Sequence, residues 1–184
     1  ARDFTQEEAD AVQAYLESGG KVVVALDPSS HKGDLANLKG ILGAWSIGVN
    51  DDLVVDPGSH YFLDMAGLIP ELKFHPVTEK LIMKDLSTVL PRSRSLYLTG
   101  EGKIPDIIIK PLLETTDKAW GETDFTAKAE FDPETDIQGP LTLAYAASRK
   151  PHSMQDQSGK ASVKDSDTIL VVVGNASFLD NDIV

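Results

Sequence analysis

The chain has 184 residues, of which 41% are hydrophobic, and 17 Lys+Arg against 29 Asp+Glu give a formal net charge of −12. This length and apolar content suit a single domain with its own core, while the acidic excess disfavours binding to nucleic acid or to anionic membrane surfaces. The absence of cysteine excludes disulfides, thiolate nucleophiles and thiolate metal sites. No apolar run approaches the roughly 20 residues that span a bilayer, so we expect any membrane anchor to lie outside residues 1–184.

The first predicted elements are a helix and the strand that follows it. Thr5 and Glu8 have the spacing of a capping box, which marks the start of the helix. Val22–Leu26 is an unbroken apolar run, typical of a strand covered on both faces by helices. Asp27 and Ser29 follow at the carboxyl end of this strand, the edge where ligands bind in open α/β sheets.

A second helix is predicted from a cap at Asp34, with apolar residues at helical spacing through Trp45. Two short strands, Ile47–Val49 and Leu53–Val55, then surround the polar turn of residues 50–52.

Three later apolar runs predict strands at Ile107–Ile109, Leu141–Ala147 and Thr168–Val173. Pro111 indicates an edge or a bulge just after the first of them. The polar stretch 150–167 is predicted to be an exposed loop. The sequence thus predicts one α/β domain over residues 1–184, with a mostly parallel, twisted sheet and helices on both faces.

The main candidate site lies at the carboxyl ends of the predicted strands. Asn175 and Ser177 come just after the last strand, so a parallel arrangement would bring them beside Asp27 and Ser29. Ser177 could be a nucleophile only with a histidine as base, and the chain lacks a G-x-S-x-G elbow. The structural alternative, which the sequence favours, is that Ser177 caps a helix beginning at Phe178. The candidate bases are His31, His60, His75 and His152.

A second candidate is the segment with Trp120, Glu122 and Asp124, where an aromatic face beside two carboxylates could form the rim of a binding site for a sugar or a peptide. The alternative is that Trp120 is a core residue with its N–H satisfied by a nearby acceptor. Arg92 and Arg94 form a small basic cluster that either docks an acidic partner or protects a solvated strand edge.

The remaining polar groups predict neither a metal site nor a cofactor. His75 precedes Pro76 and is interpreted as a hydrogen-bonded structural histidine, and Thr78 as the cap of a short helix. Asp180 and Asp182 are interpreted as acidic residues near a helix N-terminus, because no calcium-loop pattern surrounds them.

Six runs of the chain, taken in order, resemble a known family: YLESGGKVVVALDP, IGVNDDLVVDP, HPVTEKL, AWGETDF, FDPETDIQGPLTLAYA and VVVGNASFLDND. They are similar to the extracytoplasmic region of the auxiliary component of an ABC-type transport system, of the kind associated with gliding motility. The resemblance implies a fold like that of class I glutamine amidotransferases, a flavodoxin-like three-layer sandwich, without their catalytic cysteine. It also implies a periplasmic location, anchoring by membrane segments outside this chain, an additional strand before Ala1, and an ABC permease and ATPase as partners.

These observations favour a noncatalytic domain that binds a substrate or docks to the permease. A hydrolase of amidotransferase-like fold, acting on a small polar molecule or sugar, and a pure scaffold are the alternatives. Because the candidate rim is acidic, the expected partner is neutral or cationic: a sugar, a peptide or a basic loop of the permease.

Overall fold

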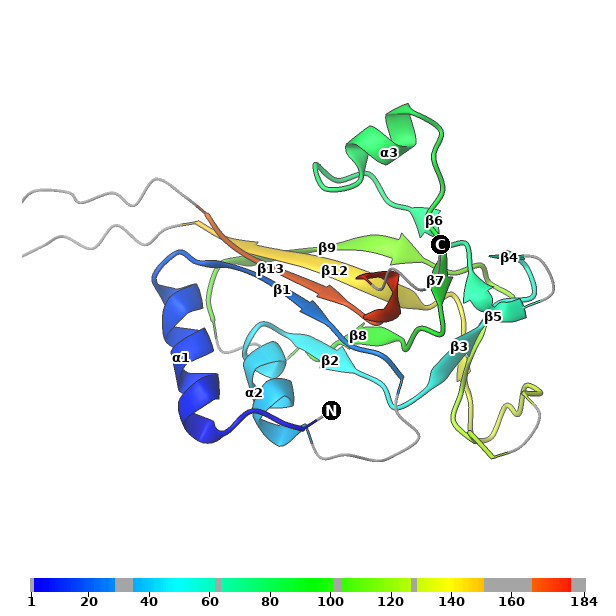
Figure 1. Cartoon of the computed structure of the whole chain (residues 1–184), viewed down its shortest axis with the longest axis horizontal. Coiled ribbons are helices and arrows are strands. Elements are labelled where there is room, and N and C mark those ends of the chain that lie inside the picture. Colours follow the sequence, from blue (N-terminus) through cyan, green and yellow to red (C-terminus); the bar gives the residue numbers. More distant parts are fainter. Residues whose placement is uncertain are drawn as a thin grey trace, which may run out of the picture.

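The computed structural model of the chain describes residues 2–28, 35–61, 64–100, 104–126, 129–150 and 167–179. Strands outnumber helices in this part of the chain (Figure 1). Its α-helices are α1 (Gln6–Glu17), α2 (Ala36–Ala44) and α3 (Glu79–Met83). None of them has the length and apolar character of a membrane span.

The largest sheet has seven strands. Five of them follow one another in the order β1 (Lys21–Ala25), β13 (Thr168–Val173), β12 (Thr142–Arg149), β8 (Leu96–Leu98) and β2 (Ile47–Val49). β9 (Ile107–Glu114) also pairs with β12, and β6 (Glu71–Leu72) pairs with β9. β1 and β13 run parallel, whereas the other pairs of this sheet are antiparallel.

The predicted fold class, a mostly parallel sheet with helices on both faces in a three-layer sandwich of the glutamine amidotransferase or flavodoxin type, is therefore wrong. The four long strands predicted from apolar runs do share one sheet, but β9, β12 and β13 form antiparallel pairs. Parallel neighbours need a crossover, usually a helix, and the described residues between β9 and β13 contain none. The connections thus allow antiparallel pairing where the burial pattern alone indicated parallel strands.

Several local predictions are confirmed. β2, β13 and β3 (Leu53–Val55) have the predicted bounds. The register between β9 and β12 shifts beside Pro111, which is the predicted irregularity. The predicted loop over 150–167 and the predicted cap Asp34 fall almost wholly outside the described residues, and Asp180 and Asp182 lie outside them too.

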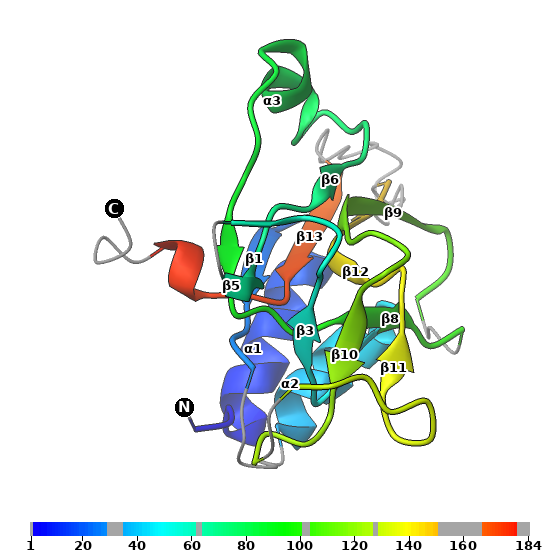
Figure 2. The ribbon, with the colours of Figure 1, turned by 90° about the vertical axis from the view of Figure 1, so that its right-hand side faces the viewer.

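Two small sheets form a second layer (Figure 2). One joins β3 to β10 (Trp120–Glu122) and β11 (Ile137–Gln138), and the other joins β4 (His60–Tyr61), β5 (Asp64–Leu68) and β7 (Leu90–Pro91). Alternate residues of β12 face different cores. Tyr145 and Ala147 pack with α1 and α2, while Ala144 and Ala146 pack with residues of β3, β5 and β7. Helices therefore cover one face of the large sheet, and strands and loops cover the other.

Carboxylates fix the first turns of α1 and α2, the two helices that cover one face of the large sheet. In α1, the predicted capping box is present: Glu8 N–H donates to Thr5 Oγ1 at 3.2 Å, and Thr5 N–H donates to Glu8 Oε2 at 2.8 Å. In α2, the free N–H groups of Asn37 and Leu38 donate to the carboxylate of Asp3 at 2.8 and 3.2 Å. Asp3 thus joins the two helices by satisfying the first turn of α2 from a distant part of the chain.

β1 is an edge strand within the described structure. Ile169 N–H donates to Gly20 O, and Leu26 N–H donates to Val173 O. The backbone N–H and C=O groups of the even-numbered residues of β1 therefore point toward β13. The backbone groups of Lys21, Val23 and Ala25 consequently point outward. The side chain of Val23 is 66% exposed, so this strand is not covered on both faces as predicted.

An apolar groove runs along this open edge, with a volume of about 350 Å³. β1 forms one wall, and Val12 of α1 with Leu38 and Ile41 of α2 form the helical side. Residues 2–4 and Leu35 complete its lining. The groove thus lies between the edge strand and the helical layer.

Candidate functional site

The parallel pairing of β1 with β13 brings the groups that follow the two strands together. Asp27 Oδ1 accepts hydrogen bonds from Ala176 N–H at 2.6 Å, Ser177 N–H at 3.0 Å and Ser177 Oγ at 3.2 Å. One carboxylate oxygen of Asp27 therefore holds the turn after β13, and the Ser177 hydroxyl donates its hydrogen bond to that oxygen. Ser29, the fourth predicted residue of this edge, lies outside the described residues.

Asn175 is fully buried and ties the turn after β13 to the backbone at residues 91–92. Its Nδ2 donates to the carbonyls of Pro91 and Arg92, and its Oδ1 accepts from Phe178 N–H at 2.8 Å. The short 3₁₀ helix η1 (Ser177–Leu179) is therefore capped by Asn175 and not by Ser177, contrary to the prediction. Asn175 is the better placed cap because it lies three residues before the N–H that it satisfies.

Neither described histidine contacts Ser177. His60 Nδ1 lies 3.1 Å from the carbonyl of Asp56, and His75 Nδ1 accepts from Val77 N–H at 3.2 Å. His31 and His152 lie outside the described residues. In the described part, no group of three His, Asp or Glu side chains is arranged to hold a metal ion. Among the described residues, the Ser177 hydroxyl thus has a carboxylate partner and not the imidazole that activates a serine nucleophile.

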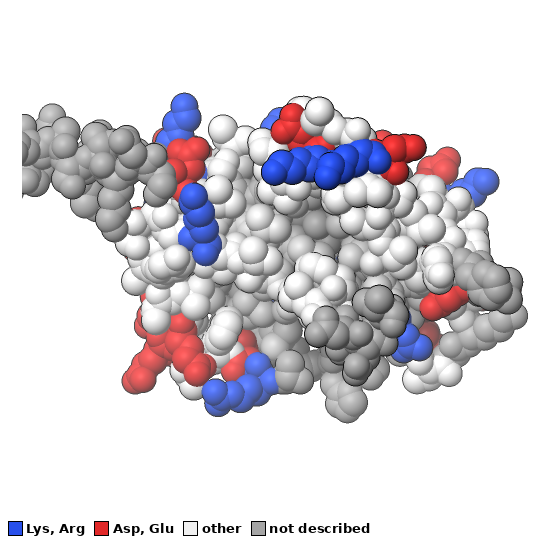
Figure 3. Space-filling model, turned by 45° about the horizontal axis from the view of Figure 1, so that its top comes forward, with Lys and Arg blue, Asp and Glu red and all other residues white. Residues whose placement is uncertain are grey.

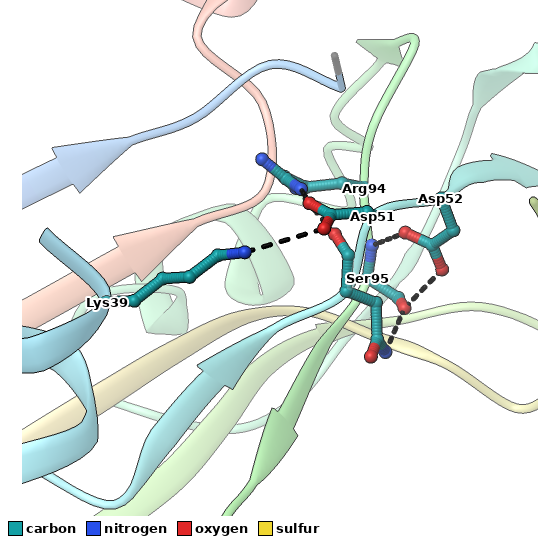
Figure 4. Close-up of polar contacts among 6 residues, drawn as sticks. Lys39, Asp51, Asp52, Arg94 and Ser95 are labelled. Carbon is teal, nitrogen blue, oxygen red and sulfur yellow. Dashed lines mark hydrogen bonds and ion pairs between the residues drawn. The ribbon is translucent and has the colours of Figure 1, made fainter. Parts of the chain in front are cut away.

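An ionic network around the buried Arg94 lies behind this edge, where the chain passes from the large sheet into the second layer (Figure 4). The Arg94 guanidinium is 1% exposed, donates from Nε to the Asn50 carbonyl at 2.8 Å and pairs with Asp51. Asp51 also pairs with Lys39 Nζ of α2 at 3.4 Å. The prediction that Arg92 and Arg94 form an exposed basic cluster is therefore wrong for Arg94, because its buried guanidinium cannot contact a docking partner.

Asp52, next along the same connection, is completely buried. Its carboxylate accepts from Ser95 N–H at 2.8 Å and from Ser95 Oγ at 2.5 Å. Burial raises the pKa of Asp52, although the bonds from Ser95 and the charge of Arg94 act in the opposite direction. Gly121 leaves the room for this carboxylate, because a Cβ there would lie 2.1 Å from Asp52 Oδ2. Residues 50–52, predicted as a polar turn between two strands, thus form a junction between the two layers.

The segment with Trp120 and Glu122 lies in another sheet from β1 and β13. Both side chains are buried, and Trp120 Nε1 donates to Glu122 Oε2 at 3.4 Å. The indole also packs against Phe131, with ring centroids 6.2 Å apart. Asp124 is exposed, and its Oδ1 accepts from Thr126 N–H at 2.8 Å and Thr126 Oγ1 at 2.6 Å. This is the core arrangement of a tryptophan whose N–H is satisfied by its neighbour.

Comparison with known proteins places the chain in a family. All of residues 1–184 match the model of a family described as an ABC-type uncharacterized transport system. The chain belongs to this family of ABC-type transport auxiliary proteins. No curated protein matches it.

Among solved structures, this member of the auxiliary family resembles one described as "mmIFT52 N-terminal domain", with a TM-score of 0.58 and 16% sequence identity. The alignment covers 98% of this chain but 64% of the other, so the chain spans less than two thirds of that structure. At this identity the likeness concerns the fold alone.

Proposed function

We propose that this chain is a noncatalytic, extracytoplasmic domain of an ABC-type transport auxiliary protein and that it docks to the permease of the same system. Membership of the family supports the role in transport. The narrower assignment to the gliding-motility type, and the periplasmic location with anchoring by segments outside this chain, rest on the six sequence runs that resemble that family.

The observation that carries the proposal is that the polar groups at the strand ends bond to each other. Asp27 accepts from the backbone and hydroxyl of Ser177, and the side chain of Asn175 bonds to backbone groups at residues 91–92 and in its own turn. A catalytic site needs a nucleophile and a base within hydrogen-bond reach of one another and of the substrate. This edge instead has the bonds of a structural turn, which favours docking over hydrolysis.

The groove along β1 favours protein contacts over a sugar ligand. Most of its lining is made of apolar side chains of β1, α1 and α2, and only two charged side chains of the described residues, Arg2 and Asp3, line it. Sugar sites need several side-chain donors and acceptors around the ring, with orientation set by hydrogen bonds. A docking partner with apolar side chains suits this surface better.

The test is co-purification of the full-length auxiliary protein with the permease and ATPase from cells that express the whole system. Asp27→Asn keeps an acceptor for the Ala176 and Ser177 N–H groups but removes the charge, and Ser177→Ala removes the hydroxyl. Both variants should co-purify and support transport as the parent does. Normal folding with loss of transport in either variant would instead support the hydrolase alternative.

Protease accessibility in intact and permeabilised cells tests the location. A cleavage site placed in the exposed turn at Lys118 should be cut from the periplasmic side of the inner membrane. Protection there, with cleavage only after the inner membrane is opened, would overturn the extracytoplasmic assignment.

A further inference from the structure

A segment that stands away from the body of the domain carries an unusual number of exposed apolar side chains. It comprises residues 73–89, between β6 and β7, and is here called the α3 arm. Both ribbon views show α3 separated from the sheets (Figures 1 and 2). No residue of α3 is buried.

Phe74 and Met83 are the most exposed large apolar residues of the arm, at 75% and 76%. Four other apolar side chains of the arm are also exposed: Val77, Ile82, Leu86 and Val89. Scattered single apolar residues are normal on a protein surface, but a concentration in one projecting segment marks an interaction site.

The arm has a defined conformation that does not depend on these side chains. Thr78 is buried, and its hydroxyl donates to the Lys73 carbonyl at 2.5 Å and accepts from His75 N–H at 3.1 Å. Lys73 Nζ in turn pairs with Glu71 and Glu114 of the large sheet, each at 2.9 Å. The base of the arm is thus tied to the sheet by polar contacts.

The far end of α3 is fixed by a Schellman arrangement. Leu86 N–H donates to the Leu81 carbonyl at 2.9 Å, and Asp85 N–H donates to the Ile82 carbonyl at 3.1 Å. Asp85 takes the left-handed conformation that this ending requires, with φ 53°. A surface held in its bound shape in advance loses less conformational entropy on association, which is what a docking element needs.

Charge decides between a lipid and a protein partner. Glu79 and Asp85 balance Lys80 and Lys84, and Lys73 is already paired with two glutamates. Groups of both signs lie side by side along the upper edge of the molecule, where the arm projects (Figure 3). Membrane-surface segments need an excess of lysine and arginine, all the more on a chain of net charge −12. At low ionic strength, two copies of so acidic a chain would also repel one another.

We propose that the α3 arm inserts its apolar side chains, led by Phe74 and Met83, into an apolar groove with a rim of mixed charge on the permease. This assignment rests on the proposed docking function and names the surface that performs it. An ordered projection with six exposed apolar side chains matches the anchor residues that dominate protein interfaces.

The permease is reconstituted in phosphatidylcholine nanodiscs, and its binding to the full-length parent protein is compared with its binding to the double variant Phe74→Glu/Met83→Glu. Both side chains are largely exposed, so the substitutions should leave thermal stability unchanged. Binding should weaken by about tenfold or more, because two charged groups would be buried in an apolar groove. Tyr61→Glu is the matched control, since Tyr61 of β4 is 62% exposed but lies outside the arm, and it should bind as the parent does.

Other outcomes separate the two proposals. If the parent binds the permease and the double variant binds equally well, the arm assignment is wrong while docking stands. If the parent does not bind, both proposals fail. If the parent binds empty nanodiscs, with or without phosphatidylglycerol, and the double variant does not, the arm binds a lipid surface. If the parent self-associates in ultracentrifugation and the double variant does not, the arm binds a second copy. Either result would overturn the permease as the partner of the arm.

Discussion

Asn175 joins the turn after β13 to residues 91–92, and its removal should destabilise the domain without touching a chemical site. In Asn175→Ala, the carbonyls of Pro91 and Arg92 lose a donor and Phe178 N–H loses its cap. We expect a loss of about 2–3 kcal/mol in the free energy of unfolding, measured by urea denaturation, because the site is fully buried.

Asn175→Asp distinguishes this explanation from simple loss of packing. The variant keeps the volume and the acceptor for Phe178 N–H but puts a second oxygen where Nδ2 donates to two carbonyls. It should be at least as destabilising as Asn175→Ala. A free energy of unfolding near that of the parent would show that the donated bonds do not matter.

Asp52 should make stability depend on pH in the opposite sense from most carboxylates. Burial raises its pKa, so the folded state holds a proton more tightly than the unfolded state does. Stability from this group is therefore greatest in acid and is lost as the pH rises from the ordinary aspartate pKa through the raised one. Exposed caps such as Glu8, whose pKa is lowered by the Thr5 N–H, act in the other direction.

Comparison with Asp52→Asn isolates this contribution. The amide introduced by this substitution would keep an acceptor for Ser95 N–H and gain a donor toward Ser95 Oγ, without a titrating group. The advantage of the variant over the parent, measured by urea denaturation, should grow between acidic and neutral pH, because the other titrating groups cancel in the difference. Two curves that stay parallel would show that Asp52 does not titrate with folding.

The buried partners of these residues could not be read from the sequence. Arg94 and Asp51 are 43 residues apart, as are Ser95 and Asp52. The segment RSRS is polar and lies in no strong periodic pattern, so burial of its second arginine has no local signature. By contrast, the contact of Asp27 with Ser177 follows from two strand ends alone, because β1 and β13 are the one pair among the described strands that is parallel as predicted.

At the scale of elements, local chemistry was predictable and strand direction was not. The capping spacing of Thr5 and Glu8 gives the start of α1, and apolar runs give β2, β3 and β13 with their bounds. An apolar run shows that both faces of a strand meet apolar groups, but not whether helices or strands supply them. Here a layer of short strands covers one face of β12, so its apolar run was wrongly interpreted as a strand of a parallel sheet with helices on both faces.

The end of α3 allows a local test of the arm. Asp85 has φ 53°, a conformation that costs most residues about 1 kcal/mol but costs glycine little. Asp85→Gly should therefore stabilise the ending of α3 by roughly 0.5–1 kcal/mol. The readout is hydrogen exchange at Leu86 N–H, which bonds to the Leu81 carbonyl and should exchange about two- to fivefold more slowly. Faster exchange in the glycine variant, or slower exchange in Asp85→Val, would contradict this account.

For the whole molecule, the open edge of β1 favours association of two copies of the chain, whereas the net charge opposes it. The outward backbone groups of Lys21, Val23 and Ala25, beside an apolar groove, offer a template for pairing with a second copy. The charge of −12 keeps copies of the isolated chain apart, but only over about 8–10 Å once physiological salt is present. Association should therefore rise with ionic strength, the reverse of contacts made through opposite charges.

Light scattering on the isolated chain over a range of salt concentrations checks this expectation. Val23→Lys places a charge at the centre of the exposed strand and should suppress the rise, with thermal stability unchanged because the parent side chain is 66% exposed. Tyr61→Lys adds the same charge on another exposed strand and should still associate as salt is added. Each lysine lowers the net negative charge by one and so would by itself favour association, which means that suppression has to come from the position of the charge. Equal suppression by both variants, or association that falls with salt, would show that the edge of β1 is not the contact.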